Sequence, residues 1–201
     1  LKSVWLQLGH QTSLKRYLKA FFVYSMAVQT VMLIATYFGE QEVLWGSDSE
    51  RTTGLIVSIM VIQLVAIIGA MLTAWASRAY GNINTLVVVN LCWVMICIYA
   101  YFVYTPTEFY IAAGFVGLVM GGIQALSRST YSKFIPETID TTSFFSFYDV
   151  SEKIGIVIGT FIYGFIAQRT GSMRDATIFL GLFFLTGMLL LLRVNKKAPT
   201  G

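Results

Sequence analysis

The sequence predicts an all-α membrane protein with six transmembrane helices. Of its 201 residues, 56% are hydrophobic and only 12% are charged, about half the charged fraction of a typical soluble domain. Long apolar stretches follow one another almost from end to end, and the loops between them alternate in positive charge. Because lipid offers the backbone no hydrogen bonds, each span has to satisfy its own polar groups as a helix.

Six apolar runs can each supply one span, for which roughly 20 residues are needed. They are Ala20–Phe38, Thr52–Ala76, Ile83–Tyr104, Phe109–Leu126, Ile154–Ala167 and Ala176–Leu192. The first four reach about that length by themselves. The fifth run is short, but further aromatic residues extend it backwards to Phe144. The sixth is long enough if the side chains of Arg174 and Arg193 extend toward the two interfaces.

The stretch before the first run has the composition of a basic amphipathic helix. Such a segment lies on a membrane surface, or it serves as a linker helix on the cytoplasmic face. We expect residues 1–19 to form this cytoplasmic linker, residues 20–196 the six-helix domain and residues 197–201 a cytoplasmic tail. The chain opens on Leu1, and we therefore expect it to be a piece of a longer protein.

The distribution of basic residues predicts the orientation in the membrane. One side of the predicted topology carries ten of them: Lys2, Lys15, Arg16, Lys19, Arg78, Arg128, Lys133, Arg193, Lys196 and Lys197. The other side carries three: Arg51, Arg169 and Arg174. Because cytoplasmic loops collect Lys and Arg, we expect both termini in the cytoplasm. The net charge of +4 follows from this bias, so we expect no nucleic-acid partner.

The residue types also predict which helices meet. The third and sixth spans are almost wholly apolar, and we expect them to face lipid. Gly114, Gly117 and Gly121 form a smooth stripe in the fourth span, and Gly155 and Gly159 are spaced by four in the fifth. Such stripes let helix backbones approach closely. They indicate either static packing or an interface that slides during gating.

Polar groups inside the spans are the candidate functional residues. Gln29, Gln63 and Gln124 either hydrogen-bond between helices or line an aqueous cavity. Asp149, Glu152 and Lys153 are the charged residues that lie well inside a predicted span. They form either an interfacial cluster, in which Asp149 pairs with Lys153, or a site that couples a substrate or proton. Cys92 and Cys97 are expected to be free, buried thiols, and the pattern predicts no metal site or cofactor.

A group of motifs resembles a known family. Residues 121–129 read Gly-Gly-Ile-Gln-Ala-Leu-Ser-Arg-Ser, followed by Ile135 and Pro136, and residues 144–148 read Phe-Phe-Ser-Phe-Tyr. This resembles a signature of one major-facilitator branch, the vacuolar amino-acid effluxer-like (autophagy-related) permeases and their bacterial relatives. The resemblance covers the chain from Arg16 to Lys196.

The gate loop of such families, between the second and third helices of a half, corresponds to residues 74–82. Arg78 and Gly81 are retained there, whereas Ser77 stands at the position of the acidic residue. Ser143 replaces the glutamate that precedes the Phe pair. These departures weaken any proton coupling that the resemblance implies.

The resemblance implies that the six spans are helices seven to twelve of a full transporter, whose N-terminal six-helix half is the missing partner. The candidate cavity residues are then Gln29, Gln63, Gln124, Tyr148, Asp149, Glu152 and Lys153. Arg78, Gly81 and Arg128 become candidate gating residues, with Arg128 able to pair with Asp149 or Glu137 when the gate is closed.

We therefore predict the C-terminal half of a secondary active transporter that moves a small polar, amino-acid-like solute by alternating access. A self-standing six-helix channel or structural oligomer is the alternative. An intramembrane enzyme is disfavoured, because the sequence contains no HExxH or GxSxG motif and its one histidine lies outside the predicted spans. We expect a plasma membrane rather than a vacuolar one. An isolated half would expose its polar face and favour a non-native dimer.

Overall fold

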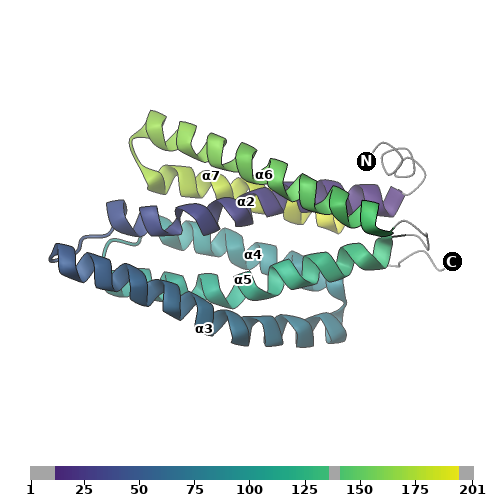
Figure 1. Cartoon of the computed structure of the whole chain (residues 1–201), viewed down its shortest axis with the longest axis horizontal. Coiled ribbons are helices and arrows are strands. Elements are labelled where there is room, and N and C mark those ends of the chain that lie inside the picture. The colour runs from purple at the N-terminus through teal and green to yellow at the C-terminus, as the bar shows by residue number, and fades with distance from the viewer. Residues whose placement is uncertain (1–11, 136–140, 195–201) are drawn as a thin grey trace.

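The computed structural model describes residues 12–135 and 141–194, and these residues form a bundle of six long helices (Figure 1). The helices are α2 (Thr12–Glu42), α3 (Asp48–Tyr80), α4 (Asn82–Tyr101), α5 (Pro106–Phe134), α6 (Thr141–Thr170) and α7 (Met173–Leu192). Each is long and apolar enough to cross a membrane. The prediction of an all-α membrane protein with six transmembrane helices is confirmed.

Side-chain caps explain where several helices begin. Ser47 Oγ accepts a hydrogen bond from the backbone N–H of Glu50 at the start of α3, and Thr105 forms a capping box with Glu108 at the start of α5. Between α3 and α4 a single residue, Gly81, reverses the chain with φ of 84°. A residue with a Cβ rarely adopts this φ, so glycine is needed at this turn.

The first helix starts inside the segment that we assign to the linker. α2 begins at Thr12, and Leu14 and Tyr17 of its first turns are fully buried in the core. Residues 1–11 and 195–201, which hold the rest of the expected linker and the tail, lie outside the described residues. The division of the chain into linker, six-helix domain and tail stays a prediction.

Glycines bring α3 and α5 into close contact. A Cβ added at Gly117 or Gly121 would meet the backbone of α3, and one added at Gly159 would meet Thr30 of α2. Gly114 has open space beside it, so the expectation that it shares the packed stripe is wrong. Close packing through small residues is confirmed for Gly117, Gly121 and Gly159, whereas a Cβ at Gly155 would make only an ordinary contact with Met26 at 3.6 Å.

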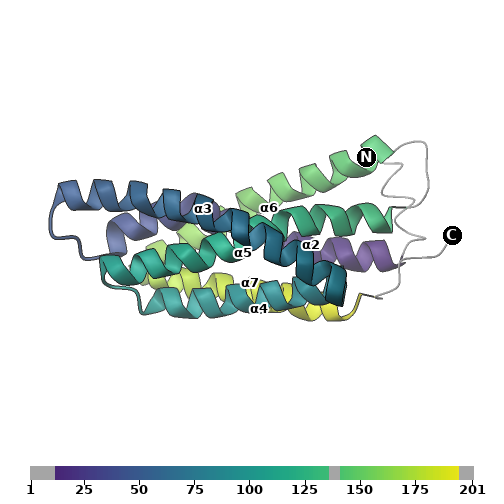
Figure 2. The ribbon, with the colours of Figure 1, turned by 90° about the horizontal axis from the view of Figure 1, so that it is seen from below.

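The expectation that the third and sixth spans face lipid stays a prediction, although α4 and α7 also pack against each other. In the most apolar windows of α4 and α7, 39% of the residues are buried, against 11% in α3 and 17% in α6. α4 and α7 lie side by side (Figure 2), and Trp93 stacks on Phe184 with 5.0 Å between ring centroids. Outside this contact, large apolar side chains stay exposed on both helices, including Met95 at 60% and Leu189 at 51%. α3 and α6 lie at opposite edges of the bundle (Figure 1).

The two ends of the bundle differ in charge. Arg16 Nη1 of α2 donates to the carbonyl of Arg193 at 3.3 Å, which places the start of α2 beside the end of α7. We call this the basic end; α3 and α5 also finish there, with Arg78 and Lys133 in their last turns. At the opposite end, the N–H of Leu44 bonds to the carbonyl of Tyr104, which joins two interhelical loops.

Candidate functional site

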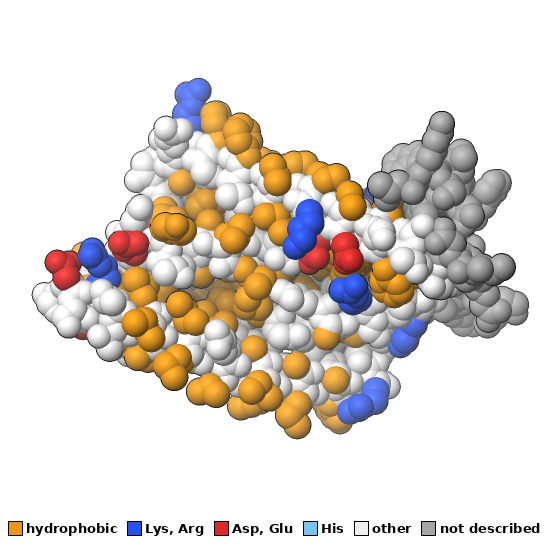
Figure 3. All heavy atoms as spheres, in the orientation of Figure 1, with side chains coloured by type: hydrophobic (Ala, Val, Ile, Leu, Met, Phe, Trp, Pro, Cys, Tyr) orange, Lys and Arg blue, Asp and Glu red, His pale blue; other side chains and the backbone are white. Residues whose placement is uncertain are grey.

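Polar and charged side chains gather where α2, α5 and α6 meet. Gln29 Nε2 of α2 donates to Glu152 Oε1 of α6 at 2.5 Å, and Arg128 Nη2 of α5 lies 3.6 Å from Asp149 Oδ1 of α6. Figure 3 shows charged side chains of both signs together on this face, between α6 and α5. Two polar pairs therefore link α6 to α2 and α5. We call the surface formed by Gln29, Arg128, Asp149 and Glu152 the transport face.

The two pairs lie at different depths. Both pairs include a residue of α6, and at 1.5 Å per residue Asp149 lies about 12 Å and Glu152 about 17 Å from Thr141. The Arg128 and Asp149 side chains are 58% and 48% exposed, while Gln29 and Glu152 are half-buried. The ion pair thus lies toward the basic end, and the amide–carboxylate pair lies deeper in the bundle.

Aromatic residues form a fixed wall behind these pairs. The buried Tyr148 stacks on Phe21 with 4.1 Å between ring centroids, and its ring lies 4.9 Å from that of Tyr131. Tyr24 and Ser127 share a hydroxyl–hydroxyl hydrogen bond of 2.7 Å. A small depression in front of this wall is lined by Tyr24, Gln29, Gln124, Ser127, Tyr148 and Glu152. The predicted residues Gln29, Gln124, Tyr148 and Glu152 therefore share one surface.

Gln63 and Lys153 lie apart from that depression, whereas Gln124 lines it. Gln124 is also exposed and donates to Met32 Sδ at 3.0 Å. Gln63 is exposed on α3 and joins none of the polar contacts of the transport face within the described residues. Lys153 is exposed beside Asp149, but the ion pair that Asp149 forms is with Arg128.

The candidate gating residues fall into two places. Arg128 contacts Asp149, as one of our two pairing hypotheses expects, and its guanidinium lies 5.6 Å from the Phe145 ring centroid. Glu137, the other expected partner, lies outside the described residues. Arg78 and Gly81 line a separate cleft at the basic end. A gating role for these three residues stays a prediction.

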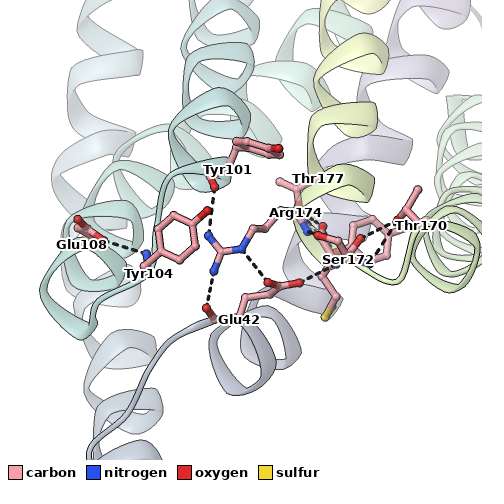
Figure 4. A network of polar contacts seen from close by, with 10 residues as sticks. Glu42, Tyr101, Tyr104, Glu108, Thr170, Ser172, Arg174 and Thr177 are labelled. Atoms are coloured by element: carbon pink, nitrogen blue, oxygen red, sulfur yellow. Dashed lines mark hydrogen bonds and ion pairs between the residues drawn. The ribbon is translucent and has the colours of Figure 1, made fainter.

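Sequence reasoning missed a polar network at the opposite end, drawn in Figure 4. Arg174 is only 7% exposed, and its Nε donates to Glu42 Oε2 at 2.7 Å. Its Nη1 donates to the carbonyl of Tyr101 at 3.1 Å and its Nη2 to the carbonyl of Glu42 at 2.5 Å. The guanidinium also lies 3.8 Å from the Tyr104 ring centroid.

The expectation that the Arg174 side chain extends into the membrane interface is therefore wrong. The side chain turns inward because Glu42 and the last carbonyls of α2 and α4 satisfy its donors. An acid at the end of one span and an arginine at the start of another are the available sequence signal. One sequence does not reveal that positions 42 and 174 meet. Both cysteines were predicted to be buried. Cys97 is buried, whereas Cys92 is exposed, so the prediction is wrong for Cys92.

Comparison with known proteins settles the family. The chain matches the family model described as "Vacuole effluxer Atg22 like" over residues 1–199. The chain belongs to this family. It is 30% identical over 184 residues to the uncharacterized MFS-type transporter YxiO of Bacillus subtilis, covering 92% of this chain and 41% of YxiO. It is 29% identical over 201 residues to autophagy-related protein 22 of Eremothecium gossypii, covering 91% of this chain and 38% of that protein.

Solved structures show the same fold. The POT family transporter PepTSo superposes with a TM-score of 0.79 at 14% identity, over 95% of this chain and 39% of PepTSo. An autoinhibited POT family peptide transporter gives a TM-score of 0.74 at 13% identity. At such identities the likeness concerns the fold alone. The chain spans about two fifths of the length of these proteins and has the fold of one half of a major facilitator transporter.

Proposed function

We propose that this chain is the C-terminal half of a secondary active transporter that moves a small, polar, amino-acid-like solute by alternating access. The transport face is the observation that carries the proposal. Its charged and amide groups lie on helices that are long and apolar enough to cross a membrane. Polar groups at membrane depth are costly and usually face a cavity or another helix bundle.

The face is suited to a solute with charges of both signs. An amino acid carries an ammonium group and a carboxylate, and Glu152 and Arg128 are their respective complements. Gln29, which already donates to Glu152, would reorient to accept from the ammonium group. Tyr148 and its stacked neighbours would hold the wall of the cavity in place.

The ion pair between Arg128 and Asp149 would close one gate. Because both side chains are about half exposed, the pair contributes only about 0–1 kcal/mol. A contact this weak can break and re-form during each transport cycle. A rocking motion of two halves around a midplane site then gives alternating access.

The missing N-terminal half would cover the transport face and the exposed sides of α3 and α6. Large apolar side chains are exposed on both helices, including Leu64 at 64% and Phe161 at 73%. We further propose that the basic end is cytoplasmic, because cytoplasmic loops collect Lys and Arg. A bacterial relative, YxiO, supports a plasma membrane, whereas the family description names the vacuole.

The direct test is transport by the full-length protein that contains this chain. Purified protein is reconstituted into liposomes loaded with unlabelled amino acids, and counterflow of the labelled compounds is measured one by one. Counterflow is driven by the gradient of the unlabelled solute and requires no ion gradient, so it detects a carrier without knowledge of its energy source. We expect at least one amino acid to exchange and Glu152→Gln to reduce that exchange at least tenfold.

Glu40→Gln is the matched control, because Glu40 is an exposed carboxylate at the far end of α2. It should leave exchange unchanged. Absence of exchange for every polar solute tested, together with ion conductance by a stable homo-oligomer, would replace the proposal with the channel alternative. Solute-dependent hydrolysis would instead favour an enzyme, which the transporter names of the relatives do not suggest.

A further inference from the structure

A cleft at the basic end carries positive charge and lies apart from the transport face. It opens between the turn that joins α3 to α4 and the last turn of α5, with a volume of about 640 Å³. Arg78 and Lys133 line it, together with the polar residues Ser77, Asn82, Asn84 and Thr130. No acidic side chain lines it within the described residues. The cleft therefore favours an anionic group.

The cations in the cleft differ in their partners. Lys133 Nζ donates to Asn82 Oδ1 at 3.1 Å, and Asn82 Nδ2 in turn donates to Thr130 Oγ1 at 3.0 Å. These contacts hold the ammonium group at the start of α4. Arg78 is exposed and forms no ion pair within the described part of the chain. Its charge is available to a ligand.

A second groove continues from this cleft toward the middle of the membrane. It has a volume of about 430 Å³, and Leu72, Val88, Val89, Leu118 and Val119 form its apolar lining. Tyr80 and Asn84 line both the cleft and the groove. A polar, basic compartment is therefore joined to an apolar one along α3, α4 and α5.

The depth of the cleft matches that of a lipid headgroup. Arg78 and Lys133 occupy the last turns of α3 and α5. Trp75 and Tyr80 are exposed beside them, with their rings in edge contact at 6.2 Å between centroids. Exposed Trp and Tyr are typical of the membrane–water interface, and basic pockets between transmembrane helices bind anionic headgroups.

We propose that this composite site binds an anionic phospholipid. The phosphate of the lipid contacts Arg78 and Lys133. The start of α4 also lines the cleft, and its first N–H groups, which no side chain caps, favour a negative charge there. One acyl chain occupies the apolar groove. The occupant would contact the α3–α4 turn and α5 together, so it would stabilise their packing.

The experiment is native mass spectrometry of the full-length protein, titrated with dioleoyl phosphatidylglycerol or dioleoyl phosphatidylcholine. We expect phosphatidylglycerol to bind more tightly, and Arg78→Gln and Lys133→Gln each to weaken it about fivefold. Val88→Phe should fill the groove and weaken both lipids. The double variant of Lys15→Gln and Lys19→Gln removes two positive charges from α2 at the basic end, as many as the double replacement of Arg78 and Lys133. It should leave lipid binding unchanged.

Inorganic phosphate and glycerol phosphate separate a lipid from a soluble anion. If either competes with phosphatidylglycerol at micromolar concentration while Val88→Phe has no effect, the site binds a soluble phosphate and the lipid proposal fails. Equal affinity for the two lipids, or insensitivity to the double replacement of Arg78 and Lys133, also overturns it. Since Arg78 and Lys133 line an open cleft and Val88 an open groove, their variants should fold, and their unfolding midpoints verify this. Lipid binding is measured without transport, so its outcome is separate from that of the transport proposal.

Discussion

Replacing Arg174 by Gln tests whether the network at the opposite end holds three helices together. The side chains of Arg174 and Glu42 are only 9% and 17% exposed, and their ion pair is 2.7 Å long. Removing one partner of a buried pair costs about 3–5 kcal/mol, because the remaining charge stays buried without compensation. The two carbonyls of α2 and α4 would also lose their donor. We therefore expect Arg174→Gln to destabilise the protein by about 3–5 kcal/mol.

The assay is equilibrium unfolding in a denaturing detergent, followed by tryptophan fluorescence. Trp45 is a suitable reporter, since its Nε1 donates to the carbonyl of Gly39 near the end of α2. The control is Arg51→Gln at the same end, whose ion pair with Asp48 is exposed and contributes about 0–1 kcal/mol. If Arg174→Gln costs no more than this control, the network does not hold the helices together and our reasoning is refuted.

Three further predictions concern packing, gating and orientation. Gly121→Ala should lower thermal stability by about 1–3 kcal/mol because its methyl group meets the α3 backbone, whereas Gly114→Ala, with open space, should raise it by about 0.5–1 kcal/mol through helix propensity. Equal effects of the two would contradict the packing. Arg128→Gln and Asp149→Asn should each change stability by less than about 1 kcal/mol yet shift the inward–outward equilibrium in the same direction, measured by fluorescence transfer between labelled halves. If neither variant shifts this equilibrium, the proposal that the ion pair closes a gate is refuted. Ser132 is exposed at the basic end, so Ser132→Cys should react with an impermeant maleimide only after the membrane is opened. Reaction in intact cells would show that the basic end is not cytoplasmic.

The six helices and their approximate positions could be predicted because the required signal is local. A long apolar run predicts a membrane span from its own length and composition. The small-residue stripe of α5 likewise predicted close packing, although not which helix it meets. Gly114 belongs to the stripe by spacing and yet faces open space. Spacing identifies a face of a helix, and tertiary arrangement decides what lies against it.

The polar contacts of the candidate site were only partly predictable for the same reason. Residue types and depth identified Gln29, Glu152 and Asp149, and the family resemblance identified Arg128 with Asp149 as one of two expected partners. The contact between Gln29 and Glu152 was not predicted. Asp149 has a basic residue one turn away at Lys153, and its ion pair nevertheless reaches Arg128 on another helix. Contacts between helices depend on their rotation and register, which one sequence does not specify.

The two ion pairs between helices suggest a division of mechanical roles. The pair at the opposite end is buried and reinforced by two carbonyls and an aromatic ring, so breaking this junction of α2, α4 and α7 is costly. The pair between α5 and α6 is longer and half exposed, so its loss costs little. If motion occurs within this half, it should therefore occur where α6 meets α5 near the basic end. The end that holds Arg174 should instead move as one body.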